Sequence, residues 1–246
     1  MTDTDAQQTL ELALVTGGAK RVGREIVLGL AKKGYAIGLH YHRSAKEATE
    51  LALELEELGT PVVLLPADLR SPAEVRKIFK QVDQAGFPLK VLVNSAAQMD
   101  RKSLTELSTK EWDALFELNV RAAWLCSIQA AERMADGGVI LNISDVGAQR
   151  AWSGYGAYSV SKAALNSLTL LLAQTLAPRI RVNAVALGLV MQDESMNPKR
   201  WQQLVEKTPL YRAVDIQAVI ETITFLLENE YITGEIVNVD GGRSLV

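Results

Sequence analysis

The feature that most constrains the fold is a glycine-rich turn between an apolar strand and a helix near the N-terminus. Leu12–Thr16 is a short apolar run, and residues 24–33 have the periodicity of a helix. Strand, turn and helix in this order form the first half of a βαβ unit. Gly17 and Gly18 allow a tight turn, and Gly23 allows the helix to pack closely on the strand. Exposed amides at the helix N-terminus favour a pyrophosphate, so the segment predicts dinucleotide binding.

The rest of the chain continues the alternation of strands and helices. Most expected strands are continuous apolar runs, as in a parallel sheet covered by helices on both faces. We therefore predict an α/β fold: a Rossmann-type doubly wound parallel sheet of about seven strands, with helices on both faces, in one domain over residues 1–246. The strands are expected at Leu12–Thr16, Ala36–His40, Val62–Pro66, Val91–Asn94, Val139–Ser144, Ile180–Ala186 and Glu235–Val239.

Three helix starts carry capping sequences. Ser44–Glu47 and Ser108–Glu111 have the spacing of a capping box, and Ser71–Glu74 combines a capping serine with a proline at the first helical position. The longer helices are expected at Ala45–Leu58, Thr109–Met134 and Gly156–Ala177, with a short one near Trp201–Lys207.

Composition and charge exclude several classes of partner. The chain has 246 residues and a net charge of −3, so we expect neither a nucleic acid nor an anionic membrane surface as partner. No uncharged apolar run reaches the roughly 18 residues of a membrane span, and the acidic N-terminus is unlike a signal peptide. The single cysteine, Cys126, lies in an apolar helical stretch and is expected to be a buried structural thiol. We expect a cytoplasmic protein without a metal site.

A second motif lies in the second half of the chain. Tyr158 and Lys162 are four residues apart, which places them one turn apart on the same face of a helix, and Asp145 lies upstream. A phenol ordinarily ionises near pH ~10, and a nearby ammonium favours the phenolate. We predict that Lys162 lowers the pKa of Tyr158. Tyr158 would then exchange a proton with a carbonyl or imine that gains or loses hydride.

The two motifs together make the chain similar to the short-chain dehydrogenase/reductase family. The family turn, Thr-Gly-x-x-x-Gly-x-Gly, is matched by Thr16–Gly23, except that Arg21 replaces the middle glycine. Asn94–Ala97 stands for the family's Asn-Asn-Ala-Gly segment, and Ile232–Gly242 looks like its last strand and closing turn. The resemblance covers essentially the whole chain. It implies a dinucleotide-dependent oxidoreductase that acts on a small molecule and self-associates, usually as a homotetramer.

The departures from the family pattern resemble the pteridine reductases. These departures are Arg21 in the turn, His40–Ser44 after the second strand, and Asp145 where most members carry the catalytic serine. That subgroup uses NADPH to reduce pterins and, in some members, folates. The resemblance further implies that Lys162 bonds the nicotinamide ribose and that Asn119 holds a water linking it to solvent. The catalytic residues implied are Asn119, Asp145, Tyr158 and Lys162.

The end of the second strand favours NADPH over NADH. NAD sites usually place an acid there for the ribose 2′-hydroxyl, but residues 35–45 contain none. A guanidinium fork fits a 2′-phosphate, and we expect Arg43 and Arg21 to approach it, with Asp68 accepting from the adenine amine. The expected cofactor contacts are Gly17, Lys20, Arg21, Val22, Tyr41, His42, Arg43, Ser44, Asp68, Leu69, Asn94, Ala96, Ser144, Tyr158, Lys162, Gly188 and Val190.

The substrate side is predicted less sharply. Residues 188–212 form the least regular stretch, which we interpret as a substrate lid. Protonated, Asp145 could deliver a proton to a ring nitrogen; ionised, it could accept from the N–H edge of a pterin. Alternatively, Ser144 takes the serine role. Where pteridine reductases carry a serine and an aromatic residue, this chain has Ala97 and Met99. The expected substrate contacts are Met99, Asp145, Tyr155, Met191 and Trp201.

Three functions are consistent with these residues. The favoured one is NADPH-dependent reduction of a C=N or C=O bond, most specifically by a pteridine (dihydropterin or dihydrofolate) reductase. The alternative is an NADPH-dependent carbonyl reductase of the 3-oxoacyl carrier-protein type, against which Asp145 argues because that chemistry expects a serine donor. The third is a non-catalytic NADPH-binding sensor, which would have no need of a proton relay such as Tyr158 and Lys162.

Overall fold

The sheet has the predicted doubly wound topology. The computed structural model describes residues 10–150, 152, 154–193 and 196–246, and in this part of the chain seven parallel strands form one sheet. The strand order is β3-β2-β1-β4-β5-β6-β7, which confirms the predicted fold class. The strands are β1 Leu12–Thr16, β2 Ala36–Tyr41, β3 Val62–Pro66, β4 Leu89–Asn94, β5 Gly138–Asp145, β6 Ile180–Leu187 and β7 Ile236–Val239.

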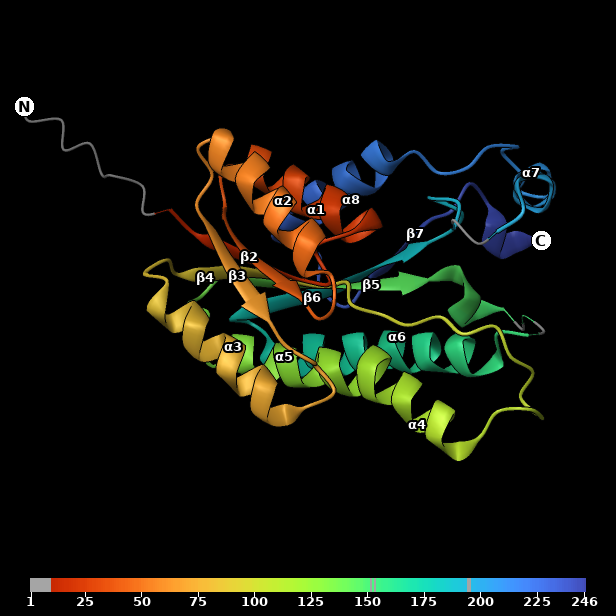
Figure 1. The fold of residues 1–246 in the computed structure, drawn as a ribbon, viewed down its shortest axis with the longest axis horizontal. Coiled ribbons are helices and arrows are strands. Elements are labelled where there is room, and N and C mark those ends of the chain that lie inside the picture. The colour runs from red at the N-terminus through yellow and green to blue at the C-terminus, as the bar shows by residue number, and fades with distance from the viewer. Residues whose placement is uncertain (1–9, 151, 153, 194–195) are drawn as a thin grey trace, which may run out of the picture.

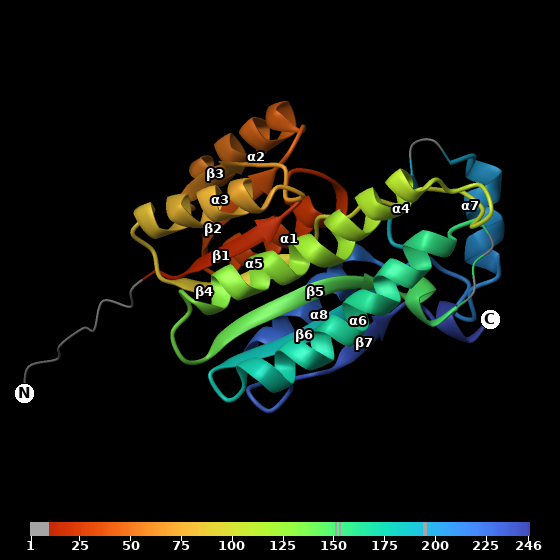
Figure 2. The same cartoon turned by 90° about the horizontal axis from the view of Figure 1, so that it is seen from below.

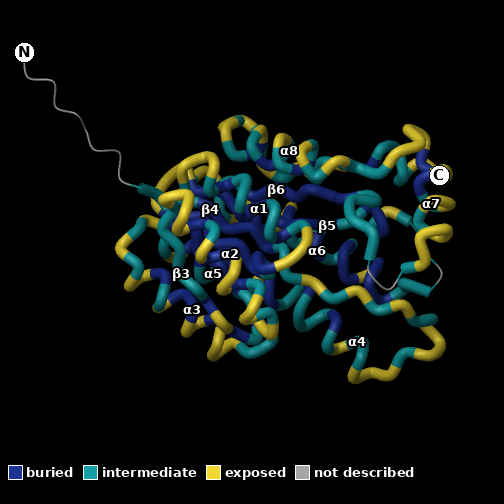
Figure 3. Tube along the Cα trace, turned by 45° about the horizontal axis from the view of Figure 1, so that its top comes forward, coloured by how far each residue is buried: buried dark blue, intermediate teal, exposed yellow. Residues whose placement is uncertain are grey.

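Helices cover both faces of the sheet (Figures 1 and 2). Alternation along β1 shows why: Leu12 and Leu14 enter one buried cluster, and Ala13 and Val15 enter the other. Figure 3 shows the strands as the buried centre between more exposed helices. One face carries α1 Arg21–Lys32, α2 Ala45–Glu57 and α8 Ile216–Glu228. The other carries α3 Pro72–Gln84, α4 Thr109–Phe116, α5 Ala122–Ala131 and α6 Gly156–Leu176.

The long helix predicted over Thr109–Met134 is not continuous. It is divided by a π-helical turn at Glu117–Arg121 and ends at Ala131. A π turn accommodates an additional residue, and here Asn119 is buried within it. The periodicity of the apolar residues did not reveal this insertion.

The capping predictions had mixed outcomes. Ser108 forms both bonds of its capping box, and Ser71 accepts from the third amide of α3. Ser44 makes no capping bond, so that prediction is wrong. The carboxylate of Glu47, which a capping box would use, pairs instead with Lys20 at 2.5 Å.

Two further helices complete the chain. The short helix expected near Trp201 is α7, Pro198–Glu206, inside the predicted lid, of which residues 194–195 lie outside the described residues. Helix α8 was not predicted, although Asp215 caps it and its apolar residues recur at helical spacing. Cys126 is buried as expected, and burial raises the pKa of its thiol to about 12. Within the described part of the chain, no helix combines the length and apolarity that a membrane span needs.

The direction of winding reverses between β1 and β4. In doubly wound sheets, ligands bind beside the carboxyl ends of the strands at such a switch point. Gly17, just after β1, has a φ of +65°, and a Cβ there would lie 2.9 Å from Cα of Ala96 after β4. Thr16 Oγ1 accepts from the amides of Ser95 and Ala96 at 3.0 and 3.1 Å. The two strand ends are therefore locked together at the base of a cleft.

Candidate active site

A cleft of about 560 Å³ lies along the carboxyl ends of the strands. We refer to its two ends by the nearest strands, as the β2 end and the β5 end. It brings together most of the residues predicted to contact cofactor or substrate. These are Gly17, Lys20, Arg21, Val22, His42, Arg43, Ser44, Asp68, Leu69, Ala96, Met99, Ser144, Asp145, Tyr158, Lys162, Gly188, Val190 and Met191.

Five predicted site residues do not line the cleft: Tyr41, Asn94, Asn119, Tyr155 and Trp201. Asn94 is buried, and its Nδ2 donates to side chains of α5 and β5, beneath the cleft. Tyr155 packs against the buried cluster that contains Tyr158. Trp201 lies on α7 and Tyr41 at the end of β2, both half-buried. The spacing of these residues in the sequence did not distinguish supporting positions from positions that line the cleft.

A histidine that the sequence analysis did not single out holds the glycine-rich turn. Nδ1 of His40 accepts from the Gly17 amide at 3.0 Å, so its Nε2 carries the proton and donates to the Ala67 carbonyl at 3.1 Å. Burial lowers the pKa of His40 to about 4. The neutral ring therefore bridges β1, β2 and β3. A histidine within an otherwise apolar strand was the available signal.

Arg21 has a different role from the one expected. Its φ is +52°, the left-handed conformation that a glycine adopts most easily. Its guanidinium donates to the carbonyls of Met191 and Gln192 at 3.1 and 3.3 Å. The side chain is thus directed to the loop after β6 and not toward Arg43 at the β2 end. That Arg21 approaches the same phosphate as Arg43 stays a prediction, and it would require the side chain to leave these two carbonyls.

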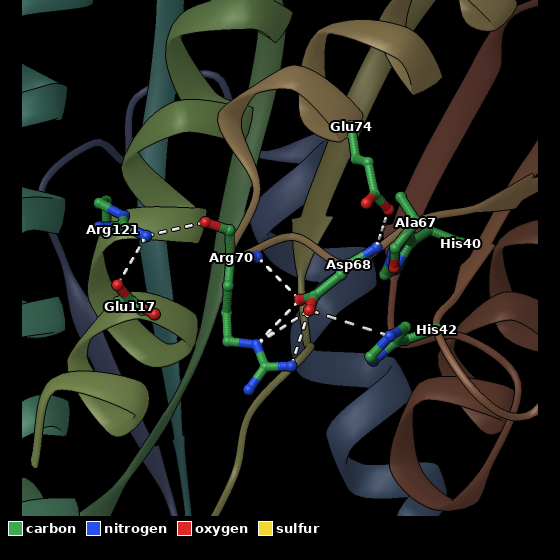
Figure 4. A network of polar contacts seen from close by, with 8 residues as sticks. All are labelled: His40, His42, Ala67, Asp68, Arg70, Glu74, Glu117 and Arg121. Carbon is green, nitrogen blue, oxygen red and sulfur yellow. Dashed lines mark hydrogen bonds and ion pairs between the residues drawn. The ribbon is translucent and has the colours of Figure 1, made fainter. Parts of the chain in front are cut away.

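The β2 end is rich in cations and contains a tight carboxylate–guanidinium pair (Figure 4). Arg70, which sequence reasoning missed, holds both oxygens of Asp68, with distances of 2.7 to 3.1 Å. This pairing lowers the pKa of Asp68 to about 2. His42 lies on the other side, 3.9 Å from Asp68 Oδ2. Each carboxylate oxygen can accept more than one hydrogen bond, so the expected bond from an adenine amine to Asp68 stays a prediction.

The donor set fits an anionic dinucleotide. Helix α1 starts at the cleft, its N-cap residue Lys20 makes no side-chain capping bond, and its first turn has no acidic residue. Its first amides and positive dipole end are therefore suited to a pyrophosphate. His42, Arg43 and Ser44 line the β2 end, where a 2′-phosphate requires cationic and multidentate donors.

The β5 end holds three titratable groups, of which Tyr158 and Lys162 are buried and Asp145 is partly exposed. Tyr158 Oη donates to Asp145 Oδ2 at 2.9 Å, and the Gly147 amide donates to Asp145 Oδ1 at 2.6 Å. Nζ of Lys162 donates to the Ile143 carbonyl at 2.8 Å and lies 5.8 Å from the centroid of the Tyr158 ring. Strand β5 ends at Asp145 and α6 carries the other two groups in its first turns, which brings the predicted set together.

The prediction that Lys162 lowers the pKa of Tyr158 is wrong. Burial raises the pKa of Tyr158 well above its usual value, and the neighbouring Asp145 raises it further. Burial also raises the pKa of Asp145, although its hydrogen bonds and Lys162 oppose this. Burial lowers the pKa of Lys162 to about 8. At neutral pH the phenol keeps its proton, and most of the Lys162 population remains charged.

Two neighbouring groups are committed to protein partners. Both amide hydrogens of Asn119 are used, toward the Gln98 carbonyl at 2.9 Å and the Ser161 hydroxyl at 3.0 Å. Its Oδ1 accepts from the Gln98 amide, so Asn119 ties the loop after β4 to α6. Ser144 Oγ donates to Asn166 at 2.5 Å and therefore directs its proton away from Tyr158.

Comparison with known proteins agrees with this geometry. The chain matches the family described as Enoyl-(Acyl carrier protein) reductase over residues 17–244. A short-chain type dehydrogenase/reductase of Picea abies is 34% identical over 248 residues, which cover 94% of this chain and 92% of that protein. The 3-oxoacyl-[acyl-carrier-protein] reductase FabG of Staphylococcus aureus is 31% identical, covering 94% of this chain and 96% of the relative.

A solved structure has the same fold. The FolM alternative dihydrofolate reductase 1 of Brucella canis, complexed with NADP, superimposes with a TM-score of 0.91. It is 33% identical in sequence, and the match covers 96% of this chain and 94% of that one. With its glycine-rich turn, its doubly wound sheet and the Asp145–Tyr158–Lys162 arrangement at the end of β5, the chain belongs to the short-chain dehydrogenase/reductase family of oxidoreductases.

Proposed function

We propose that this oxidoreductase reduces a C=N bond in a pteridine ring, as a dihydropterin or dihydrofolate reductase. The observation that carries the proposal is the bond between Tyr158 Oη and Asp145 Oδ2, because it places a carboxyl group where a serine hydroxyl would serve a simple ketone. Nitrogen heterocycles present both ring nitrogens that take up protons and N–H groups that donate. The fold shared with the Brucella FolM protein supports the same reading.

The cofactor is NADP(H), which supplies the hydride when it is bound. The α1 N-terminus would hold the pyrophosphate, and His42, Arg43 and Ser44 would hold the 2′-phosphate. Nζ of Lys162 lies 5.8 Å from the centroid of the Tyr158 ring and would supply a positive charge to the nicotinamide ribose. Thr16 and His40 set the shape of the turn and need not contact the cofactor.

The protonation states suit donation of a proton to the reduced ring. Tyr158 keeps its phenolic proton, because burial and Asp145 both raise its pKa. Because its pKa is raised, Asp145 is protonated to a greater extent than an exposed aspartate at the same pH. A protonated Asp145 donates to a ring nitrogen and takes up the phenolic proton that Tyr158 shares with it, and Lys162 stabilises the charge that remains on Tyr158.

A second candidate is reduction of a 3-oxoacyl thioester, as by the Staphylococcus relative. Ala97 and Met99 favour it, because neither supplies an aromatic face for a pterin, although Met99 is half exposed in the cleft and its thioether can cover a ring. Ser144 does not replace the missing serine, since its hydroxyl donates to Asn166. A non-catalytic NADPH sensor ranks third.

The test follows NADPH oxidation at 340 nm with dihydrobiopterin, dihydromonapterin, dihydrofolate and an acetoacetyl thioester. We expect turnover of a pterin substrate and none of the thioester. Asp145→Ser should then reduce pterin turnover by about 10²-fold, the size expected for loss of a positioned acid. Asp145→Asn, which keeps the shape, is the matched variant. Thioester turnover alone would reject the proposal, and NADPH binding without any turnover would favour the sensor.

We also propose that the chain self-associates as a homotetramer through α5 and α6. Large apolar side chains on these helices are exposed in the single chain: Trp124 by 46%, Val160 by 44% and Leu171 by 61%. Such a surface is costly in water and is typical of an interface. Light scattering after size exclusion tests this, with Leu171→Glu expected to reduce the mass to that of a smaller assembly. A monomeric wild type would reject the proposal.

A further inference from the structure

Three arginines lie on the segments that follow the neighbouring strands β5, β6 and β7, at the β5 end of the cleft. Arg150 follows the short 3-10 turn Val146–Gln149 after β5, Arg200 lies on α7 after β6, and Arg243 opens the C-terminal 3-10 turn after β7. The ends of these strands are in register, with Asp145 opposite Leu187 and Leu187 opposite Val239. Figures 1 and 2 both show α7 and the C-terminal end at this side of the sheet.

The segments that carry Arg150 and Arg243 are fixed to each other. Arg150 Nη1 donates to the Arg243 carbonyl at 3.0 Å. The amides of Gln149 and Asn238 exchange hydrogen bonds of 3.0 and 3.2 Å, which join the turn after β5 to β7. Asp240 holds the C-terminal turn by accepting from the amides of residues 242 and 244. The backbone segments that carry these two arginines are therefore held in place by hydrogen bonds.

Within the described part of the chain, the positive charges of this cluster have no ion-paired carboxylate. Nε of Arg243 is buried and has no hydrogen-bond partner. Burial lowers the pKa of Arg243, and the charges of Arg150 and Arg200 lower it further. Among the described residues, no carboxylate forms an ion pair with any of the three, and the Asp240 carboxylate is occupied by backbone amides. Because a guanidinium stays charged, an anion is the group that would satisfy the cluster.

We propose that Arg150, Arg200 and Arg243 form an anion-binding subsite that takes a carboxylate or phosphate on the distal part of the substrate. This rests on the proposed reductase function. Arg150 is five residues beyond Asp145, about 10 Å at the rise of a 3-10 helix. A reduced group held at Asp145 and Tyr158 thus places a tail of that length against the arginines. The subsite selects substrates with an anionic tail over neutral ones of the same core.

The test compares substrates that share a core and differ in the tail. The first pair is dihydrofolate, which has carboxylates, and the neutral dihydrobiopterin. The second pair is acetoacetyl-CoA, which has phosphates, and the neutral acetoacetyl-N-acetylcysteamine thioester. In Arg243→Gln and in Arg200→Gln we expect KM for the anionic member to rise about tenfold, as for loss of one charge-assisted hydrogen bond. Its kcat, and both constants for the neutral member, stay unchanged. A change of KM within the dihydrofolate pair identifies a carboxylate tail, and a change within the acetoacetyl-CoA pair identifies a phosphate tail.

Two controls separate binding from folding. Lys199→Gln removes the same charge from the neighbouring position of α7 and should leave every KM unchanged, and Arg243→Lys should recover most of the loss. Equal shifts for both members of a pair, no shift, or the same effect from Lys199→Gln would overturn the proposal. Arg200 is exposed, so its variant keeps the test valid if Arg243→Gln fails to fold.

A binding measurement tests the anion-binding subsite independently of the proposed reaction. Calorimetric titration with p-aminobenzoylglutamate and with inorganic pyrophosphate should show binding of at least one to the wild-type protein, and at least tenfold weaker binding to Arg243→Gln and Arg200→Gln. Absence of binding, or equal binding to the variants, would overturn the subsite. If the wild type reduces neither pair of substrates, the proposed function fails, and this titration alone decides the subsite.

Discussion

The two ends of the cleft hold their charges in opposite ways. At the β2 end, charged groups such as Lys20 and Asp68 are partly exposed and are paired with neighbours, Lys20 with Glu47 and Asp68 with Arg70. At the β5 end, Tyr158 and Lys162 are buried and Asp145 is partly exposed, and desolvation by the surrounding protein is the first cause of the pKa shift of each. The first arrangement suits recognition of a charged ligand, and the second suits proton transfer.

The difference follows from the cost of charge in each environment. Exposed ion pairs contribute little to stability and can be exchanged for contacts with a phosphate at small cost. Buried titratable groups are held by the fold, so their protonation states are set before substrate arrives. Variants at the two ends of the cleft test this contrast.

Removing the phenolic hydroxyl should have the largest effect. Tyr158→Phe keeps the ring that packs beside Leu115 and Ala157 but deletes the proton donor. We expect kcat to fall by about 10³-fold, within the range for loss of a general acid, with the Kd for NADPH unchanged. Steady-state kinetics and cofactor fluorescence measure the two quantities. Tyr231→Phe, at a position 98% exposed, is the control. Retention of most of the activity would assign proton donation to Asp145 alone.

Neutral His40 should make stability depend on pH below neutrality. Its pKa is lowered to about 4 when folded, so the unfolded chain binds more protons between pH 4 and about 6.5. Stability is therefore fully present above pH ~6.5 and falls by roughly 3 kcal/mol as the pH drops toward 4. Urea unfolding at pH 7 and pH 5 measures this. His40→Gln should flatten the dependence, whereas His42→Gln should not; equal pH profiles for all three proteins would show that His40 is not responsible.

Reversing one charge at the β2 end should separate the two cofactors. Arg43→Glu replaces a partner of the 2′-phosphate with a repelling carboxylate, so the Kd for NADPH should rise about 100-fold, and that for NADH much less. Lys46→Glu makes the same charge change three residues away, where Lys46 is exposed and pairs with Glu50, and should leave both Kd values nearly unchanged. Comparable losses for both cofactors would disprove the 2′-phosphate assignment.

The smallest effect concerns the connection between the two ends. At Arg21, whose φ is +52°, Arg21→Gly should be more stable than Arg21→Ala by about 1 kcal/mol, because alanine strains in the left-handed region. Both variants lose the bonds to the carbonyls of Met191 and Gln192. Their KM for substrate should therefore change equally, while urea unfolding distinguishes them. Equal stability of the two variants would mean that the backbone at this position leaves the left-handed conformation once the arginine side chain is absent.

The strand–turn–helix, the parallel sheet and the set of residues around Asp145 could all be predicted from the amino-acid sequence. These depend on local patterns: apolar runs, glycines at a turn, and Tyr158 and Lys162 at helical spacing. The tertiary structure decided what the individual groups do. The pKa of Tyr158 is raised and not lowered, because burial and Asp145 outweigh a lysine that bonds Ile143. Burial and charge pairing depend on segments far apart in the chain.

The same division applies to the supporting residues. Neither the bidentate grip of Arg70 on Asp68 nor the His40 bridge could be derived from spacing, because each depends on side-chain directions at the sheet edge. The π turn at Asn119 likewise forms where the loop after β4 offers Gln98 as partner. A sequence specifies which groups are present and how nearby ones repeat. Contacts between distant segments, which set protonation and orientation, exist only once the chain is packed.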